Sequence, residues 1–275
     1  MIEEEKKDCS LKIRQELSKK GFFSGFLPAS LNSFITLSVF NDIIKKINSF
    51  KKINTNNSND LEKILINNLS KLTHEEIDTF FGPISNRYLP PQTVAFEVSQ
   101  YLKSHFKSKY NINLFLHGIR RSDRQKLLPS VEESSTIAIW YRVYPPNSKC
   151  GLPHRDLDFW KIDEVANEPI DDATRIKFWM PIYGCNKKNS LRLWPGSHKL
   201  KIKSEFTSTD KRLVPFINQD QLTKCGEYVC PSYDKGQFVL FADRTIHQGP
   251  PNINSRKDGY RISLETTLFV NSNII

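Results

Sequence analysis

The first 130 residues carry apolar side chains at helical spacing. Helices are expected over residues 1–20, after Asp60, after Thr73 and over residues 92–110. Asp60 suits an N-cap position, and Pro90-Pro91 breaks the chain before the longest of these helices. Five residues of that helix are expected to face inward: Val94, Val98, Tyr101, Leu102 and Phe106. The pattern therefore predicts a mostly helical N-terminal half.

Two segments between these helices are less regular. Residues 22–40 form the most apolar window, but Gly25, Pro28 and several serines interrupt it. This window is too short and too interrupted to span a bilayer, and it predicts a buried or docking helix. Residues 41–60 predict one or two helical turns followed by an Asn-rich loop.

Beyond about residue 134 the pattern changes. Apolar and β-branched runs become short, and clusters of Pro, Gly, Asn and Asp separate them, which is typical of an all-β sandwich or barrel. Strands are expected over residues 136–144, 154–161, 175–183, 190–194, 237–242 and 260–270. We expect a helical region over residues 1–130 and a β core over residues 131–275, joined in one structural unit.

Composition and charge narrow the class of protein. The 275 residues are 38% hydrophobic and 25% charged, which is ordinary for a globular protein. The formal net charge is +10, and the excess lies mainly before residue 131, where there are 20 Lys and Arg against 13 Asp and Glu. Because no dense basic block stands beside aromatic residues, this excess favours acidic small molecules or polyanionic surroundings over sequence-specific nucleic-acid binding.

Cysteine usage and the N-terminus indicate a compartment. The five cysteines are odd in number and scattered along the chain, which favours a reducing environment. The first eight residues are acidic, whereas a signal peptide begins with a basic segment. We therefore expect a cytoplasmic location and no transmembrane segment.

His154 and Asp156 stand two residues apart in an aromatic-rich run. On a strand, side chains two residues apart point the same way, so an imidazole and a carboxylate would lie side by side. They would form two of the three ligands in the 2-His-1-carboxylate triad that holds non-haem Fe(II). Alone, such a triplet is a weak signal, and the alternative is an exposed histidine beside a charged strand end. His247, which follows an apolar strand and a polar turn, suits the second histidine.

Arg261 and Ser263 share one face of the last expected strand by the same two-residue rule. A guanidinium group grips a carboxylate through two parallel charge-assisted hydrogen bonds, which a lysine cannot copy. The pair is thus a candidate anchor for a buried carboxylate. Arg256 and Lys257, in the preceding loop, are alternative anchors, and Arg261 could instead be a surface cation.

The order of these features resembles a known superfamily. A Pro-Gly-Ser-His turn at residues 195–198 follows the His-x-Asp pair, and the distal histidine and the Arg-x-Ser pair come after it. Over residues 134–270 this order resembles the Fe(II)/2-oxoglutarate-dependent dioxygenase superfamily, specifically its phytanoyl-CoA dioxygenase-like branch. The resemblance implies an α+β protein. Its core would be a double-stranded β-helix (a jelly-roll, cupin-like barrel) with the mostly helical N-terminal region packed against it.

The resemblance also implies roles for individual residues. The implied iron ligands are His154, Asp156 and His247. Arg261 would bind the C5 carboxylate of 2-oxoglutarate, with Ser263 as its helper, and His198 in the Pro-Gly-Ser-His turn would be structural. Arg261 follows His247 by 14 residues, which is longer than the family's usual interval and keeps Arg256 and Lys257 open as anchors.

The implied reaction is the oxidation of an unactivated C–H bond, in which O2 and 2-oxoglutarate are converted with release of succinate and CO2. A carboxylate at position 156 favours hydroxylation or a related oxidation, because halogenating relatives have a small residue there. Residues that could line the substrate pocket, each of which could equally be structural, are Arg142, Arg155, Asp158, Trp160 and Lys177. Their charges favour a polar or anionic small molecule.

Two other functions stay open. The basic N-terminal half is compatible with a nucleic-acid or protein hydroxylase of the same chemistry, which would bind in a salt-dependent way. A barrel that only binds or senses a ligand is the non-enzymatic alternative, and a complete triad argues against it.

Overall fold

The computed structural model describes residues 2–51, 60–81, 87–116, 139–149, 151–162, 173–209, 212–253 and 259–271. The helices are α1 (Ile2–Lys20), α2 (Ala29–Phe50), α3 (Leu61–Ser70), α4 (His74–Phe81), α5 (Gln92–Tyr110), α7 (Asp156–Ile162), α8 (Gln219–Thr223) and the short 3-10 helix η3 (Ser197–Lys199). The strands are β1 (Phe22–Phe26), β2 (Arg87–Tyr88), β3 (Phe115–Leu116), β4 (Ile139–Tyr144), β5 (Ala173–Tyr183), β6 (Arg192–Leu193), β7 (Glu205–Thr209), β8 (Arg212–Phe216), β9 (Gln237–Ala242), β10 (His247–Gln248) and β11 (Arg261–Asn271).

Four helices lie where the sequence predicts them, namely α1, α3, α4 and α5. The side chain of Asp60 accepts hydrogen bonds from two backbone N–H groups of α3 and so caps it. α4 begins with a capping box, in which Thr73 and Glu76 each accept a hydrogen bond from the other's backbone N–H. α5 has the predicted bounds because Pro91 precedes it and Asn111, in the left-handed region at φ 52°, ends it.

The helix expected over residues 22–40 is wrong in its first part. Gly21, at φ +84°, turns the chain, and residues 22–26 form β1, which pairs with β9. The helix α2 starts only after Pro28. It continues to residue 50, about one turn beyond the one or two turns expected after residue 41, because its apolar stripe stays buried down to Ile47. The Asn-rich residues 52–59 lie outside the described residues.

The inward face of α5 is also narrower than expected. Val98, Leu102 and Phe106 are fully buried and Val94 is partly buried. Tyr101 is 53% exposed and lies beside Phe34, with 4.8 Å between the ring centroids. The expectation that Tyr101 faces the core is therefore wrong: its ring covers the edge of the core instead.

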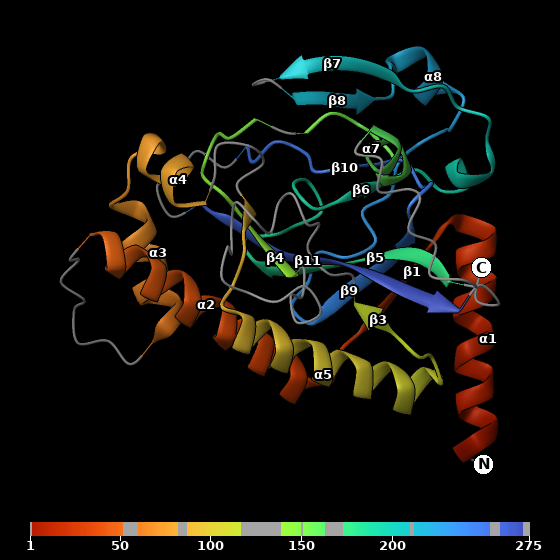
Figure 1. Cartoon of the computed structure of the whole chain (residues 1–275), viewed down its shortest axis with the longest axis horizontal. Helices are drawn as coiled ribbons and strands as arrows, with labels where there is room; N and C mark the ends of the chain where they lie inside the picture. Colours follow the sequence, from red (N-terminus) through yellow and green to blue (C-terminus); the bar gives the residue numbers. More distant parts are fainter. Residues whose placement is uncertain are drawn as a thin grey trace.

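The strands form an antiparallel main sheet in the order β1-β9-β5-β11-β4-β2, with β3 also paired to β11. β9 has the predicted bounds, and β4, β5 and β11 occupy most of their predicted ranges. The strand predicted over residues 190–194 is limited to β6, which pairs with β10, and β7 pairs with β8 in a hairpin. Figure 1 shows β6, β10 and this hairpin on one side of the main sheet. The chain thus combines helices with an antiparallel sheet, as the α+β expectation requires.

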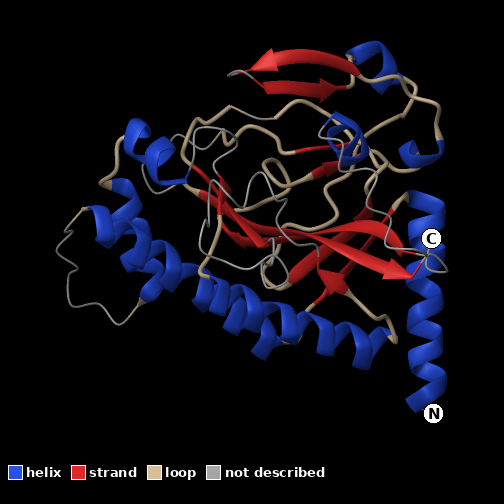
Figure 2. Cartoon of the chain, viewed as in Figure 1, coloured by secondary structure: helices blue, strands red, loops and turns tan. Residues whose placement is uncertain are grey.

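The two faces of the main sheet have different neighbours. On β11, Ile262, Leu264 and Leu268 point into a core cluster that also contains buried residues of α1, α2, α3 and α5. Figure 2 shows α2 and α5 running along this side of the sheet. We call this the core face. The alternate residues of β4, β5 and β11 point to the opposite side, which we call the site face because it carries the candidate functional groups described next.

Candidate metal centre

The two histidines are brought together by a backbone bridge. The N–H of His154 donates to the carbonyl of His247 at 3.0 Å, and the N–H of His247 donates to the carbonyl of His154 at 2.9 Å. This reciprocal pair places the imidazole rings side by side, with 4.3 Å between their centroids. His247 opens the short strand β10.

Asp156 reaches the same point from a helix. The sequence predicts a strand over residues 154–161, and this prediction is wrong: only His154 makes a β-bridge, and α7 begins at Asp156. Acidic residues in the first turn stabilise a helix through its N-terminal partial charge, and both Asp156 and Asp158 lie there. A hydrogen bond from the N–H of Leu157 to the carbonyl of Asp243, at 3.0 Å, ties the start of α7 to the end of β9.

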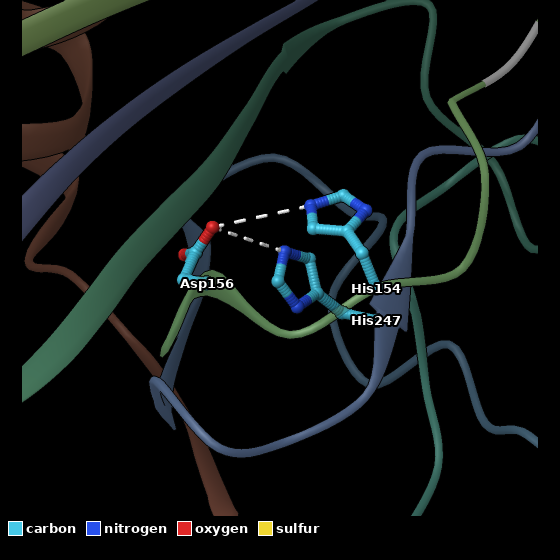
Figure 3. Close-up of side chains that lie close together, drawn as sticks. All are labelled: His154, Asp156 and His247. Atoms are coloured by element: carbon cyan, nitrogen blue, oxygen red, sulfur yellow. Dashed lines mark ion pairs between the residues drawn. The ribbon is translucent and has the colours of Figure 1, made fainter. Parts of the chain in front are cut away.

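The three side chains converge on one point (Figure 3). Oδ1 of Asp156 lies 3.9 Å from Nε2 of His154 and 3.7 Å from Nε2 of His247. One candidate ligand atom from each residue lies within 4.8 Å of the other two. These separations exceed hydrogen-bond length. Nitrogen and oxygen ligands bind a metal such as zinc at about 2.1 Å, so a single ion can bridge atoms up to about 4 Å apart.

Both imidazoles are oriented by their other ring nitrogen. Nδ1 of His154 lies 2.6 Å from the carbonyl of Leu152, and Nδ1 of His247 lies 3.1 Å from the carbonyl of Thr245. A carbonyl only accepts, so each Nδ1 carries the hydrogen and each Nε2 turns its lone pair toward Asp156. Burial lowers the pKa of His154 to about 3, with His247 adding to the effect, and burial also lowers the pKa of His247. Both rings are therefore neutral, as metal ligands must be.

The carboxylate of Asp156 has one oxygen in need of a partner. Its Oδ2 is buried and has no hydrogen-bond partner, although the ammonium of Lys177 lies 3.6 Å away. Burial acts to raise the pKa of Asp156, but charge interactions, of which that with Lys177 is the largest, outweigh it, so the pKa lies below its usual value. A buried, ionised carboxylate between two neutral imidazoles fits a divalent cation of the first transition series.

The site face of the sheet adds two ion pairs whose side chains are buried or partly buried. Arg142 on β4 pairs with Glu265 on β11, with 2.8 Å between Nη2 and Oε1. Arg175 on β5 pairs with Asp243 at 3.4 Å, and burial raises the pKa of Asp243 to about 6 even beside this arginine. Sequence reasoning missed Glu265 and Asp243. Extending the two-residue alternation from Arg261 along β11 would have placed Glu265 on this face.

Arg261 is buried on the same face. Its Nη1 donates to the carbonyl of Pro250 at 2.8 Å and to the carbonyl of Asn189, and its guanidinium lies 4.1 Å from the ring centroid of Tyr144. Its Nη2 faces Gly249, since a Cβ added there would lie 3.8 Å from it. Gly249 follows His247 by two residues, so the guanidinium stands close to the bridge between the histidines. Ser263 is also buried, whereas Arg256 and Lys257 lie outside the described residues.

The remaining candidate residues have local partners. Arg155 and Asp158 bind one another at 2.8 Å, and both contact Ser204, so they connect α7 to the segment before β7. The side chain of Trp160 lies outside the described part of the structure. Nε2 of His198 lies 3.1 Å from the carbonyl of Ser18 at the end of α1, which agrees with a structural role for its turn.

A cavity of about 860 Å³ lies behind the histidine bridge. It is lined by Pro153 and Gln248, the sequence neighbours of His154 and His247, together with Arg192, Trp194 and Tyr228. Successive strand residues point to opposite sides, so this cavity and the metal centre lie on opposite sides of the bridge.

Comparisons with known proteins agree with this geometry. The model of the family described as "Phytanoyl-CoA dioxygenase (PhyH)" matches residues 50–259, which is more than half of the chain. The chain belongs to the phytanoyl-CoA dioxygenase family. It is therefore an Fe(II)- and 2-oxoglutarate-dependent dioxygenase, and its cofactors are Fe(II) and 2-oxoglutarate. A search of the curated proteins gave no match.

Solved structures of low sequence identity share the fold of this dioxygenase. EctD from S. alaskensis, solved with 2-oxoglutarate and 5-hydroxyectoine, has a TM-score of 0.51 at 13% identity, covering 94% of this chain and 74% of that one. The same protein solved with bound Fe has a TM-score of 0.50 at 12% identity, covering 94% and 75%. SnoN, a non-heme alpha ketoglutarate dependent epimerase from nogalamycin biosynthesis, has a TM-score of 0.50 at 9% identity, covering 95% and 82%.

Proposed function

We propose that His154, Asp156 and His247 bind Fe(II) and that the dioxygenase hydroxylates, or otherwise oxidises, an unactivated C–H bond of a polar or anionic small molecule. The single observation that carries the ligand assignment is the convergence of two neutral imidazoles and one ionised carboxylate on one point. When bound, Fe(II) with 2-oxoglutarate supplies the activation of O2 that such an oxidation requires. Succinate and CO2 leave as co-products.

The protein's own residues orient and enclose this chemistry. The carbonyls of Leu152 and Thr245 fix the imidazole tautomers, and the ammonium of Lys177 lies 3.6 Å from the second oxygen of Asp156. These three residues would hold Fe(II) and would leave its remaining positions to the co-substrates. A buried Arg261 close to that site suits the C5 carboxylate of 2-oxoglutarate, with Ser263 beside it on the same strand face.

We further propose that the core is a double-stranded β-helix. The main sheet would supply one wall, and the β6–β10 pair, which carries His247, would belong to the opposing wall. The helical residues 1–130 and the β core of residues 131–275 would form one structural unit, which is supported by a core cluster that draws on both.

Small molecules are the proposed substrates because four charged groups of the site, Asp156, Lys177, Glu265 and Arg261, are buried. EctD is described with the small molecule 5-hydroxyectoine, and SnoN is described as an epimerase from nogalamycin biosynthesis. No helix within the described residues is long and apolar enough to cross a membrane. The cysteines at 185, 225 and 230 are free, which supports a reducing compartment such as the cytoplasm.

The test is metal and co-substrate binding under anaerobic conditions. Wild-type protein with Fe(II) and 2-oxoglutarate should develop a 2-oxoglutarate-dependent iron chromophore, and admission of O2 should release succinate slowly even without substrate. A protein that takes up Fe(II) but develops no such chromophore, and releases no succinate with any member of a small-molecule library, would contradict the proposed function.

A further inference from the structure

The charges of the site face carry an inference about the substrate. Charged groups on or beside this face include Asp156, Lys177, Arg142, Glu265, Arg175, Asp243 and Arg261. Four of these form two ion pairs: Arg142 with Glu265, and Arg175 with Asp243. Ions in a buried site need compensation, because removing an isolated charge from water is costly. The remaining charges belong to Asp156, Lys177 and Arg261.

When Fe(II) and 2-oxoglutarate bind, one of these three charges is left without an ion of opposite charge beside it. Fe(II) carries two positive charges, which Asp156 and the oxo-acid carboxylate of 2-oxoglutarate together balance. The C5 carboxylate of 2-oxoglutarate balances Arg261. Lys177 then loses its only ionic partner among the described residues, because Asp156 becomes shared with the metal.

The position of Lys177 fits a role in ligand binding. Its ammonium is buried, 3.6 Å from Oδ2 of Asp156, and it donates to Oγ1 of Thr267 at 3.4 Å. Both contacts are long for an ammonium, which has three donors. Lys177 stands on β5 directly opposite Thr267 of β11, so the pairing of these two strands fixes the position of its Cα atom beside the metal centre.

We infer that the substrate carries one anionic group, a carboxylate or a phosphate monoester in kind, and that Lys177 binds it. This inference rests on the proposed function and narrows its substrate class from polar or anionic to anionic. Because Lys177 also touches Asp156, the bound anion lies next to the metal. The carbon that is oxidised must then lie within a few bonds of the anionic group.

The experiment uses the anaerobic complex of the protein with Fe(II) and saturating 2-oxoglutarate. Acetate and benzoate are compared with acetamide and benzamide at constant ionic strength, and binding is followed by the shift of the iron chromophore and by calorimetry. We expect each anion to bind at least about tenfold more tightly than its amide, the gain of a hydrogen bond to a charged group. The chromophore should shift and keep its intensity, which shows that 2-oxoglutarate stays bound.

Three variants test whether Lys177 causes the tighter binding of anions than of amides. Lys177→Met should reduce the preference to about twofold or less, and Lys177→Arg should restore it. Lys188→Met removes the same charge from an exposed position and should keep the wild-type preference. Equal binding of anions and amides to the wild-type complex would overturn the inference. So would an undiminished preference in Lys177→Met, or loss of the chromophore when the anions bind. A wild-type protein that forms no chromophore at all contradicts the proposed function instead.

Discussion

The core face and the site face of the main sheet are built from alternate residues of the same strands, yet they carry opposite kinds of side chain. On β11, Ile262, Leu264 and Leu268 pack in the core cluster with helical residues, whereas the alternate residues Ser263 and Glu265 lie on the site face. The core face supplies buried apolar area, and the site face supplies buried charge. A shift of one residue in the pairing would exchange the two faces, so the register of β4, β5 and β11 determines both stability and chemistry.

The largest expected effect is on the chemistry of the site face. Replacing Asp156 with alanine removes the only carboxylate of the candidate triad. Succinate release should fall by about 10³-fold or more, because even residues behind metal ligands typically contribute about 10–100-fold. Asp234→Ala, a change at an exposed position, is the control and should retain wild-type succinate release. Wild-type turnover and iron content in Asp156→Ala would remove Asp156 from the ligand set.

Substitutions at two neighbouring residues of β11, one on each face, test the two faces separately. Leu264 is fully buried in the core, and Leu264→Ala should lower the free energy of unfolding by about 2–5 kcal/mol through loss of packing and the cavity left behind. Ser263→Ala should lower it by about 1 kcal/mol or less, and it should weaken 2-oxoglutarate binding instead. Denaturant unfolding of both variants measures the difference. Equal destabilisation would mean that the two faces do not divide stability and function as proposed.

The next effect concerns the co-substrate. Arg261→Ala should weaken 2-oxoglutarate binding by about 10–100-fold, which corresponds to the loss of charge-assisted hydrogen bonds. Arg261→Lys keeps the charge without the planar fork and should give an intermediate affinity. Titration of the iron chromophore with 2-oxoglutarate measures both. Normal affinity in Arg261→Ala would move the anchor to Arg256 or Lys257.

The same comparison shows how far the sequence predicts this molecule. Helix α5 follows from its apolar period, the prolines before it and Asn111 after it, all of which are local signals. His154 and Asp156 come together as expected, but a helix start, not a strand, positions Asp156. The seven residues of α7 mix apolar and acidic positions in a way that fits either the helical or the strand period. The β-bridge that decides between them joins His154 to His247, which lies far away in the sequence.

Pairs across strands are outside the reach of single-sequence reasoning. Lys177 was a candidate for the pocket by its residue type, but its approach to Asp156 depends on how β5 pairs with β11 and on where α7 begins. The ion pair of Arg142 with Glu265 likewise needs the register of β4 against β11. Such registers are set by the whole sheet, so alternation on one strand predicts a face but not the partner on it.

The smallest expected effect concerns a titratable group on the apolar side of the molecule. His105 on α5 is buried beside the rings of Phe106 and Tyr110, and its Nε2 has no hydrogen-bond partner. Burial, with a smaller contribution from Lys109, lowers its pKa from 6.5 to about 4. The folded state therefore disfavours the charged ring, in contrast to the site face, where Arg142 and Arg175 each pair with a carboxylate.

The sign of the resulting pH dependence follows from this shift. Between pH 6.5 and pH 4 the unfolded chain binds a proton at His105 that the folded protein does not. The contribution of the neutral His105 ring to the free energy of unfolding is fully present above pH 6.5. As the pH falls from 6.5 toward 4, the free energy of unfolding decreases by about 1–2 kcal/mol, after allowance for partial solvent access. His105→Phe removes the titration and keeps an aromatic ring, so its unfolding free energy should fall less than that of the wild type over this range. Denaturant unfolding at pH 7, 5.5 and 4 measures the two slopes. Parallel slopes would show that His105 takes up its proton without opening the apolar layer, and that charge is tolerated on both sides of the sheet.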